Sequence, residues 1–263
     1  MTDAPPVQTF AYQPGIALDY WCGGARPAAL VVYAHGGSFM TGNRKDRLAR
    51  HFAAMLPGMG LAFASIDYRK GGDPWRDLAE DDRPAIEAAI ARSAEVYPEI
   101  AARLFGPLLY RATRDFGAAV DWLRHDTAGP ALGGLPLIVA GLSAGGMAAL
   151  GHAYGLDGTG GSAAPVLALG LAAVPPQPWR IAPGQTCRAG LLIARGDAIM
   201  PRAAVHRLTA DLQARGCPVE VEMIPYGQHN RPIREVLHDG DGLWRDWFPR
   251  QVSSAIHQVR GLS

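Results

Sequence analysis

A serine at the centre of a glycine-rich pentapeptide is the strongest chemical signal in the sequence. Ser143 lies in residues 141–145 (GLSAG), after an apolar run and at the start of a segment rich in alanine and glycine. A G-x-S-x-G between a strand and a helix is typical of a sharp turn that exposes a serine hydroxyl. The residues next to Ser143 must be small to allow this sharp turn. The N–H of Ala144, at the start of the predicted helix, would lie beside the negative charge that develops when the serine attacks a substrate. Ser143 is therefore the candidate nucleophile.

A serine hydroxyl is a weak nucleophile until a histidine takes its proton and a carboxylate orients that histidine. His229 follows the last predicted strand, in residues 226–230 (YGQHN), and Asp197 follows the strand before it, after Gly196. The order Ser143, Asp197, His229 matches one known chain order of such triads. His238 is the alternative base, and Asp239 or Asp241 would be the first alternatives to Asp197.

A second glycine-rich segment, residues 35–39 (HGGSF), follows the first central strand. Consecutive glycines expose backbone N–H groups that a substrate oxygen can approach closely, as an oxyanion hole requires. The plainer interpretation is a tight strand-to-helix turn. We expect His35 to brace this loop rather than to act as a base.

These residues need a scaffold in which strands alternate with helices. Short apolar runs, of the kind buried on both faces of a parallel sheet, occur at 29–34, 61–67, 135–141, 164–173, 191–195 and 219–225. Helical segments are predicted at 44–55, 111–124, 143–154, 202–215 and 244–259. The pattern predicts an α/β fold with a mostly parallel central sheet and helices on both faces. Segments 8–12 and 17–22 are expected to add an antiparallel edge.

One stretch, residues 71–109, interrupts this alternation. Residues 84–97 are predicted to form a helix, with Pro84 in the first turn, and residues 98–105 a second, shorter one. We expect this helical insertion to act as a lid that forms one wall of the substrate pocket; the alternative is a surface ornament packed on a neighbouring helix. Phe39, Leu142, Met147 and Met200 are expected to line an apolar pocket of modest size.

Composition narrows the class of protein. The chain has 263 residues, 48% hydrophobic and 19% charged, with a net charge of +1, which favours one α/β domain over residues 1–263 and argues against disorder and nucleic-acid binding. The three cysteines are scattered and form no CxxC pair. The sequence shows no apolar run long enough to span a membrane and no secretory signal. These features point to the cytoplasm. The oligomeric state stays open, with a homodimer as one option.

Taken together, these motifs resemble the α/β-hydrolase superfamily and, more narrowly, carboxylesterases related to hormone-sensitive lipase and the small HGG-loop esterases and arylformamidases. The matching segments are 35–37 (HGG), 67–69 (DYR), 141–146 (GLSAGG), 196–197 (GD) and 227–229 (GQH). The resemblance implies that Ser143 is the nucleophile, His229 the base and Asp197 its orienting acid. It also implies an oxyanion hole made by the N–H groups of Gly37, Ser38 and Ala144, with no metal or organic cofactor.

The chain departs from that pattern in three places. Ser38 stands where a third glycine is usual, Asp67-Tyr68-Arg69 is followed by Lys70-Gly71-Gly72, and the cap that many relatives insert after the 164–173 strand is missing. We expect a carboxylesterase for small or aromatic esters. An amidase or arylformamidase with the same triad, and a non-hydrolytic isomerase, lyase or binding protein with the same fold, are the alternatives.

Overall fold

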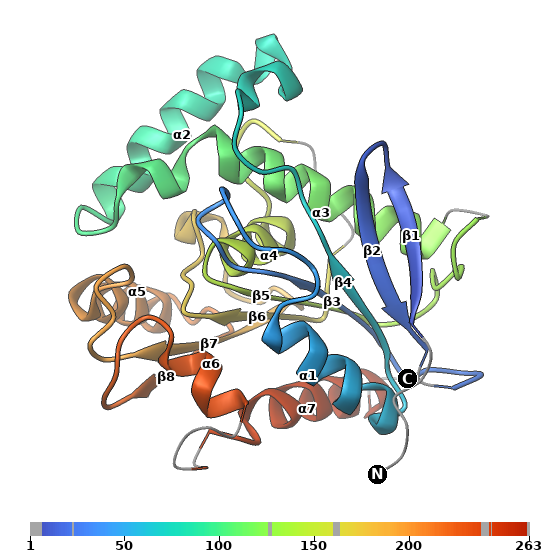
Figure 1. Ribbon diagram of the computed structural model, residues 1–263. Coiled ribbons are helices and arrows are strands. Elements are labelled where there is room, and N and C mark those ends of the chain that lie inside the picture. The colour runs from blue at the N-terminus through green and yellow to red at the C-terminus, as the bar shows by residue number, and fades with distance from the viewer. Residues whose placement is uncertain are drawn as a thin grey trace.

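An eight-stranded sheet forms the centre of the computed structural model, which describes residues 7–22, 24–125, 128–159, 164–237, 242 and 244–261 (Figure 1). The strand order is β1-β2-β4-β3-β5-β6-β7-β8. The strands are β1 (Gln8–Gln13), β2 (Ile16–Trp21), β3 (Leu30–Ala34), β4 (Ala62–Ile66), β5 (Leu137–Leu142), β6 (Leu167–Leu171), β7 (Arg188–Ala194) and β8 (Val219–Ile224). Strands β3 to β8 are parallel, and β1 and β2 form the antiparallel edge. The predicted mostly parallel sheet is confirmed.

The burial of the strands explains why they appear in the sequence as unbroken apolar runs. All residues of β3, β4 and β6 are buried, because helices cover both faces of the sheet. Strand β6 is shorter than the predicted 164–173, since the chain turns out of the sheet at Ala172, whose φ is +50°.

Helices pack on the two faces of the sheet in separate groups. Alternate residues of β3 belong to different apolar clusters, Val32 to one and Val31 to the other. The cluster containing Val32 includes residues of α2 (Arg83–Val96), α3 (Pro107–His125), α4 (Ala144–Tyr154) and α5 (Arg202–Ala214). The cluster containing Val31 includes residues of α1 (Arg47–Met55), α6 (Arg231–Val236) and α7 (Trp247–Gly261). None of the helices within the described ranges is long and apolar enough to cross a membrane.

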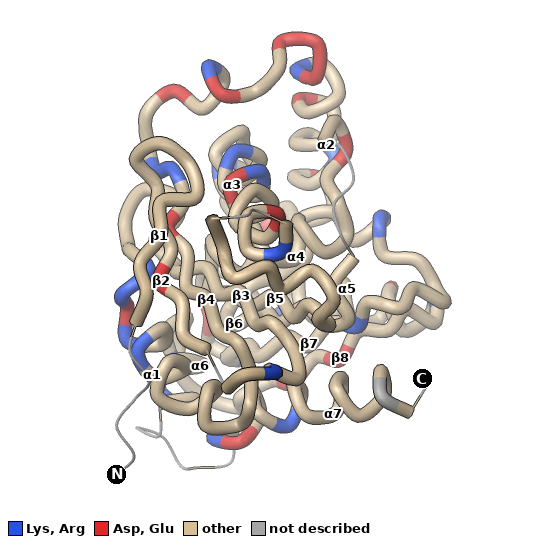
Figure 2. The backbone as a smooth tube through the Cα atoms, turned by 90° about the vertical axis from the view of Figure 1, so that its right-hand side faces the viewer, with Lys and Arg blue, Asp and Glu red and all other residues tan. Residues whose placement is uncertain are grey.

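The insertion at 71–109 is helical, as predicted. It contains α2 and the short 3₁₀ helices η2 (Pro74–Asp77), η3 (Glu80–Asp82) and η4 (Ala102–Phe105), and acidic and basic residues are interspersed along its outer part (Figure 2).

Its inner side is anchored to the link that follows β6. The hydroxyls of Tyr97 and Ser93 donate to the carbonyls of Pro175 and Pro176 at 2.8 and 3.1 Å. The insertion thus packs on the core through α2, and its role as a lid stays a prediction.

Candidate active site

Ser143 occupies a strained turn between β5 and α4. Its φ and ψ are +49° and −118°, a backbone region that non-glycine residues seldom adopt and that is found mainly where function requires it. The turn is held by the Ser143 N–H, which donates to the Leu171 carbonyl at 2.8 Å.

The glycines around Ser143 are a steric requirement of this turn. A Cβ on Gly145 would lie 2.3 Å from the carbonyl oxygens of Ala34 and His35, and a Cβ on Gly141 would lie 2.3 Å from the Gly145 carbonyl. Only glycine allows α4 to begin so close to the end of β3. The local sequence therefore permits the close approach of the Ser143 turn to the end of β3.

Three strand ends bring Ser143, His229 and Asp197 into one hydrogen-bonded chain. The Nε2 atom of His229, in the loop after β8, lies 2.8 Å from Ser143 Oγ, and its Nδ1 lies 2.7 Å from Asp197 Oδ2. Parallel strands end at the same edge of a sheet, so β5, β7 and β8 place all three side chains together. With Nδ1–H donating to the carboxylate, the Nε2 lone pair faces the Ser143 hydroxyl, which is the geometry of a base beside a nucleophile.

The Asp197 carboxylate is held in place by two backbone donors. Its side chain is fully buried, and Oδ1 accepts from the N–H groups of Ile199 and Met200 at 2.8 and 2.9 Å. These bonds compensate for removing the carboxylate from water. They leave Oδ2 for the imidazole of His229.

The loop after β3 holds backbone N–H groups that have no acceptor among the described residues. Gly37 has φ +123°, and a Cβ there would lie 2.3 Å from the Thr41 carbonyl oxygen. The Gly37 carbonyl accepts from the N–H groups of Met40 and Thr41 at 2.9 and 3.0 Å, and the Gly36 carbonyl accepts from His35 Nδ1 at 2.7 Å.

Since the carbonyl and the N–H of a planar trans peptide point in opposite directions, those bonds turn the N–H groups of Gly37 and Ser38 the other way. Neither N–H, nor that of Ala144, donates to any acceptor among the described residues. The three predicted oxyanion donors thus have no acceptor within the part of the chain that the structure describes.

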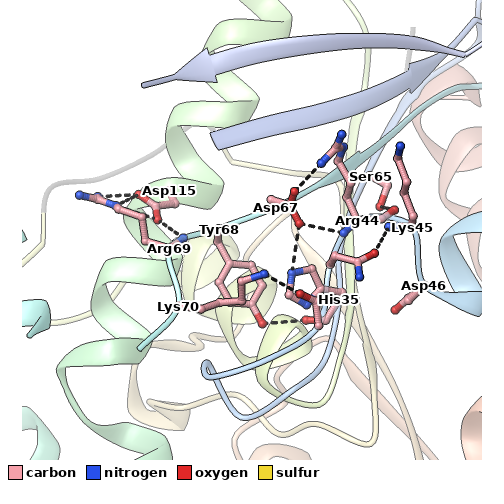
Figure 3. Close-up of polar contacts among 12 residues, drawn as sticks. His35, Arg44, Lys45, Asp46, Ser65, Asp67, Tyr68, Arg69, Lys70 and Asp115 are labelled. Carbon is pink, nitrogen blue, oxygen red and sulfur yellow. Dashed lines mark hydrogen bonds and ion pairs between the residues drawn. The ribbon is translucent and has the colours of Figure 1, made fainter. Parts of the chain in front are cut away.

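His35 supports this loop from behind, as the sequence predicts. It is fully buried and stacks on the Tyr68 ring at 4.4 Å between centroids, while the Tyr68 hydroxyl donates to the His35 carbonyl at 2.9 Å (Figure 3). Burial lowers the pKa of His35, which favours the neutral ring with Nδ1–H bonded to Gly36. The side chain of His35 faces the core and has no place in proton transfer to Ser143.

A charged network formed by Asp67 and Arg44 lies beside His35. Asp67 Oδ1 is 3.6 Å from His35 Nε2 and accepts from the Arg44 N–H at 2.9 Å, and Asp67 Oδ2 accepts from the Arg44 guanidinium at 2.6 Å (Figure 3). The next residues reach the loop directly: Lys70 Nζ donates to the Gly42 carbonyl at 2.5 Å. Asp67, Tyr68 and Lys70 thus fix the loop, whereas Arg69 bonds to Asp115 and Asp77. The sequence marked residues 67–69 as a matching motif but assigned these residues no role.

Of the four residues predicted to line a pocket, one lines a hollow and three are buried. Leu142 lines a hollow of about 370 Å³ between the start of α1 and α6. Phe39, Met147 and Met200 are fully buried, so in this structure they support the site from within and present no surface to a substrate.

A second hollow, of about 430 Å³, is lined by residues 227–231 and Arg234, and so adjoins His229. Neither of these two hollows is lined by the insertion at 71–109. Helix α6, which supplies Arg234 to both, was not predicted from the sequence.

Other chemical groups add little to the site. Among the residues the structure describes, no three His, Cys, Asp or Glu side chains come together in a way that could hold a metal ion. The alternative base His238 and the alternative acids Asp239 and Asp241 lie outside the described residues.

No protein-family model and no curated protein matches the sequence. Solved structures of esterase 2 from Thermogutta terrifontis do match in structure. The form phosphorylated by paraoxon shares 15% identity over 92% of this chain and 94% of that chain, with a TM-score of 0.62. The propionate-bound form shares 15% identity over 93% and 94%, with a TM-score of 0.58. The apo form shares 14% over 94% and 96%, also with a TM-score of 0.58. At this level of identity the likeness concerns the fold, and with the sheet order and strand-end loops described above it shows that the chain has the α/β-hydrolase fold.

Proposed function

We propose that the protein is a serine hydrolase that cleaves small or aromatic carboxylic esters. The observation that carries this proposal is the chain from Asp197 through His229 to Ser143. Three backbone N–H groups, those of Gly37, Ser38 and Ala144, have no acceptor among the described residues and can serve as oxyanion donors. A nucleophile, a base, an orienting acid and an oxyanion site are the parts that acyl transfer needs.

In the proposed reaction Ser143 Oγ attacks the ester carbonyl carbon while its proton passes to His229 Nε2. The buried Asp197 carboxylate stabilises the imidazolium, and the N–H groups of Gly37, Ser38 and Ala144 bind the oxyanion. The C–O bond to the alcohol breaks, and His229 returns the proton to the leaving oxygen. Water, deprotonated by His229, then attacks the acyl-serine ester and releases the carboxylic acid, and the proton returns to Ser143.

Two observations favour esters with small acyl groups. One structural neighbour, esterase 2 from Thermogutta terrifontis, has been solved with propionate and with butyrate bound. In this chain two of the exposed large apolar side chains, Met40 and Ile199, lie on the loops that follow β3 and β7, at the catalytic edge of the sheet. An apolar rim of this kind suits a short or aromatic acyl group.

The proposal is tested by turnover of 4-nitrophenyl esters from acetate to decanoate, beside an N-formyl aromatic amide. We expect hydrolysis that is fastest for the short and aromatic esters, and a loss of roughly 10³–10⁶-fold in kcat in Ser143→Ala. Ser254→Ala, at an exposed serine of α7, is the matched control and should be unaffected. Faster turnover of the amide would favour the amidase alternative, and no turnover of either would favour a non-hydrolytic protein.

A further inference from the structure

The two hollows beside the triad share a wall that carries positive charge. Leu142, next to Ser143, and Asn230, next to His229, both line the hollow between α1 and α6. Arg234 lines this hollow and also the one that adjoins His229. Asn230 and Arg234 are four residues apart at the start of α6, so their side chains lie on the same side of the helix.

Two arginines of α6 differ in how their charge is used. The Arg231 guanidinium donates to Glu235 Oε1 at 2.6 Å and lies over the Tyr226 ring, 4.5 Å from its centroid. Glu235 is fully buried, so this pair belongs to the fold. Arg234 is exposed and forms no hydrogen bond or ion pair with any described residue. Its guanidinium is therefore available to a ligand.

The rest of the first hollow suits a ligand that is apolar with one charged end. Leu142, Leu48 and Ile233 provide apolar surface. Among the described residues of its lining, Asp46 alone is acidic, and it directs both oxygens into the protein: Oδ1 accepts from the Ala49 N–H at 2.7 Å and Oδ2 from the Tyr33 hydroxyl at 2.8 Å. Among the described lining residues, both carboxylate oxygens are thus engaged by other donors and neither bonds to Arg234.

We propose that Arg234, with the amide of Asn230, forms a subsite for a carboxylate on the substrate. The preferred esters then carry a free carboxylate separated from the scissile ester by a short apolar spacer, as in the half-esters of dicarboxylic acids. This inference rests on the proposed hydrolase function, because the scissile ester must reach Ser143 while the carboxylate occupies the hollow. The guanidinium binds the anion through charge-assisted hydrogen bonds.

Two pairs of matched esters test the subsite and locate the carboxylate. The first pair is 4-nitrophenyl hydrogen glutarate and its methyl-capped analogue, with the charge on the acyl group. The second is 4-acetoxybenzoate and its methyl ester, with the charge on the leaving group. In at least one pair we expect kcat/KM to be about tenfold higher for the anion than for its neutral partner. A tenfold preference lies between the contribution of an exposed ion pair and that of a charge-assisted hydrogen bond. Arg234→Gln should remove this preference by lowering kcat/KM for the anion of that pair to the value of its neutral partner.

Arg103→Gln is the matched control, because Arg103 is an exposed arginine of η4 that lines neither hollow; it should keep the preference. Equal turnover within both pairs, or a preference that survives in Arg234→Gln, would overturn the proposal.

A direct binding measurement separates this proposal from the proposed function. Monomethyl and dimethyl glutarate are titrated calorimetrically into Ser143→Ala and into the double variant with Arg234→Gln. Tighter binding of the monoanion that is lost in the double variant supports the subsite even if no ester is hydrolysed, in which case only the hydrolase function fails. No difference between the two ligands would overturn the subsite even if the protein proves to be an esterase.

Discussion

Replacing Asp197 by asparagine should remove catalysis through a single proton. Asp197 Oδ1 accepts from two backbone N–H groups, so the amide oxygen of asparagine must take that position. The amide NH₂ then faces His229 Nδ1, which lies 2.7 Å from Oδ2 in the native site. The imidazole can only accept there, so its proton moves to Nε2, opposite Ser143 Oγ. The base is lost while every heavy atom stays in place.

The size of the effect follows from the loss of general-base catalysis at an otherwise intact site. We expect kcat to fall by roughly 10³–10⁴-fold, which corresponds to about 4–5.5 kcal/mol of activation free energy. KM should change little, because Asp197 is fully buried and does not touch the substrate.

The assay is steady-state hydrolysis of a short 4-nitrophenyl ester, with thermal unfolding measured in parallel. Asp121→Asn, at an exposed aspartate of α3, is the control and should behave like the wild type. An Asp197→Asn protein that is folded and retains more than a tenth of the wild-type kcat would refute the reasoning. The acid would then have to come from elsewhere, with Asp239 and Asp241 the first candidates.

Two further predictions concern the oxyanion loop and the pH dependence of stability. Gly37→Ala places a Cβ 2.3 Å from the Thr41 carbonyl oxygen, so kcat/KM should fall roughly 10²–10³-fold, whereas Gly184→Ala, also at positive φ but in open space, should leave kcat/KM at the wild-type value. Burial lowers the pKa of His152 from 6.5 to about 4. As the pH falls, the unfolded chain therefore takes up a proton on this histidine before the folded protein does. His152 then contributes about 3 kcal/mol to the free energy of unfolding above pH 6.5, and this contribution is lost as the pH falls to about 4. Urea unfolding at several pH values should show a shallower loss in His152→Gln; an unchanged slope would contradict this.

The apolar runs predicted the sheet well because burial on both faces leaves little room for polar residues. All eight strands appear within a few residues of their predicted ranges. Helix α6 was missed because its six residues, with Pro232 in the first turn, are too few to show a helical period. Strand β6 was drawn too long because the buried residues after Leu171 continue the apolar run although the backbone has already turned.

The sequence predicted those parts of the candidate site that depend on the backbone, such as the turn at Ser143. It did not predict the parts that depend on the direction in which side chains point. Small residues around Ser143, and a histidine and an aspartate that each follow a strand, are requirements visible in the sequence. Whether Phe39 or Met200 faces a pocket or the core depends on loop conformation, which the sequence did not reveal; both face the core. Arg234 was missed because its importance comes from the hollows that α6 creates.

Covalent labelling provides the decisive test of whether Ser143 is an activated nucleophile. The wild-type protein and Ser143→Ala are treated with paraoxon, and the modified peptide is identified by mass spectrometry. We expect a diethylphosphoryl group on Ser143, stoichiometric loss of esterase activity, and no label in Ser143→Ala. No label on the folded wild-type protein, or a label on another residue that persists in Ser143→Ala, would contradict it.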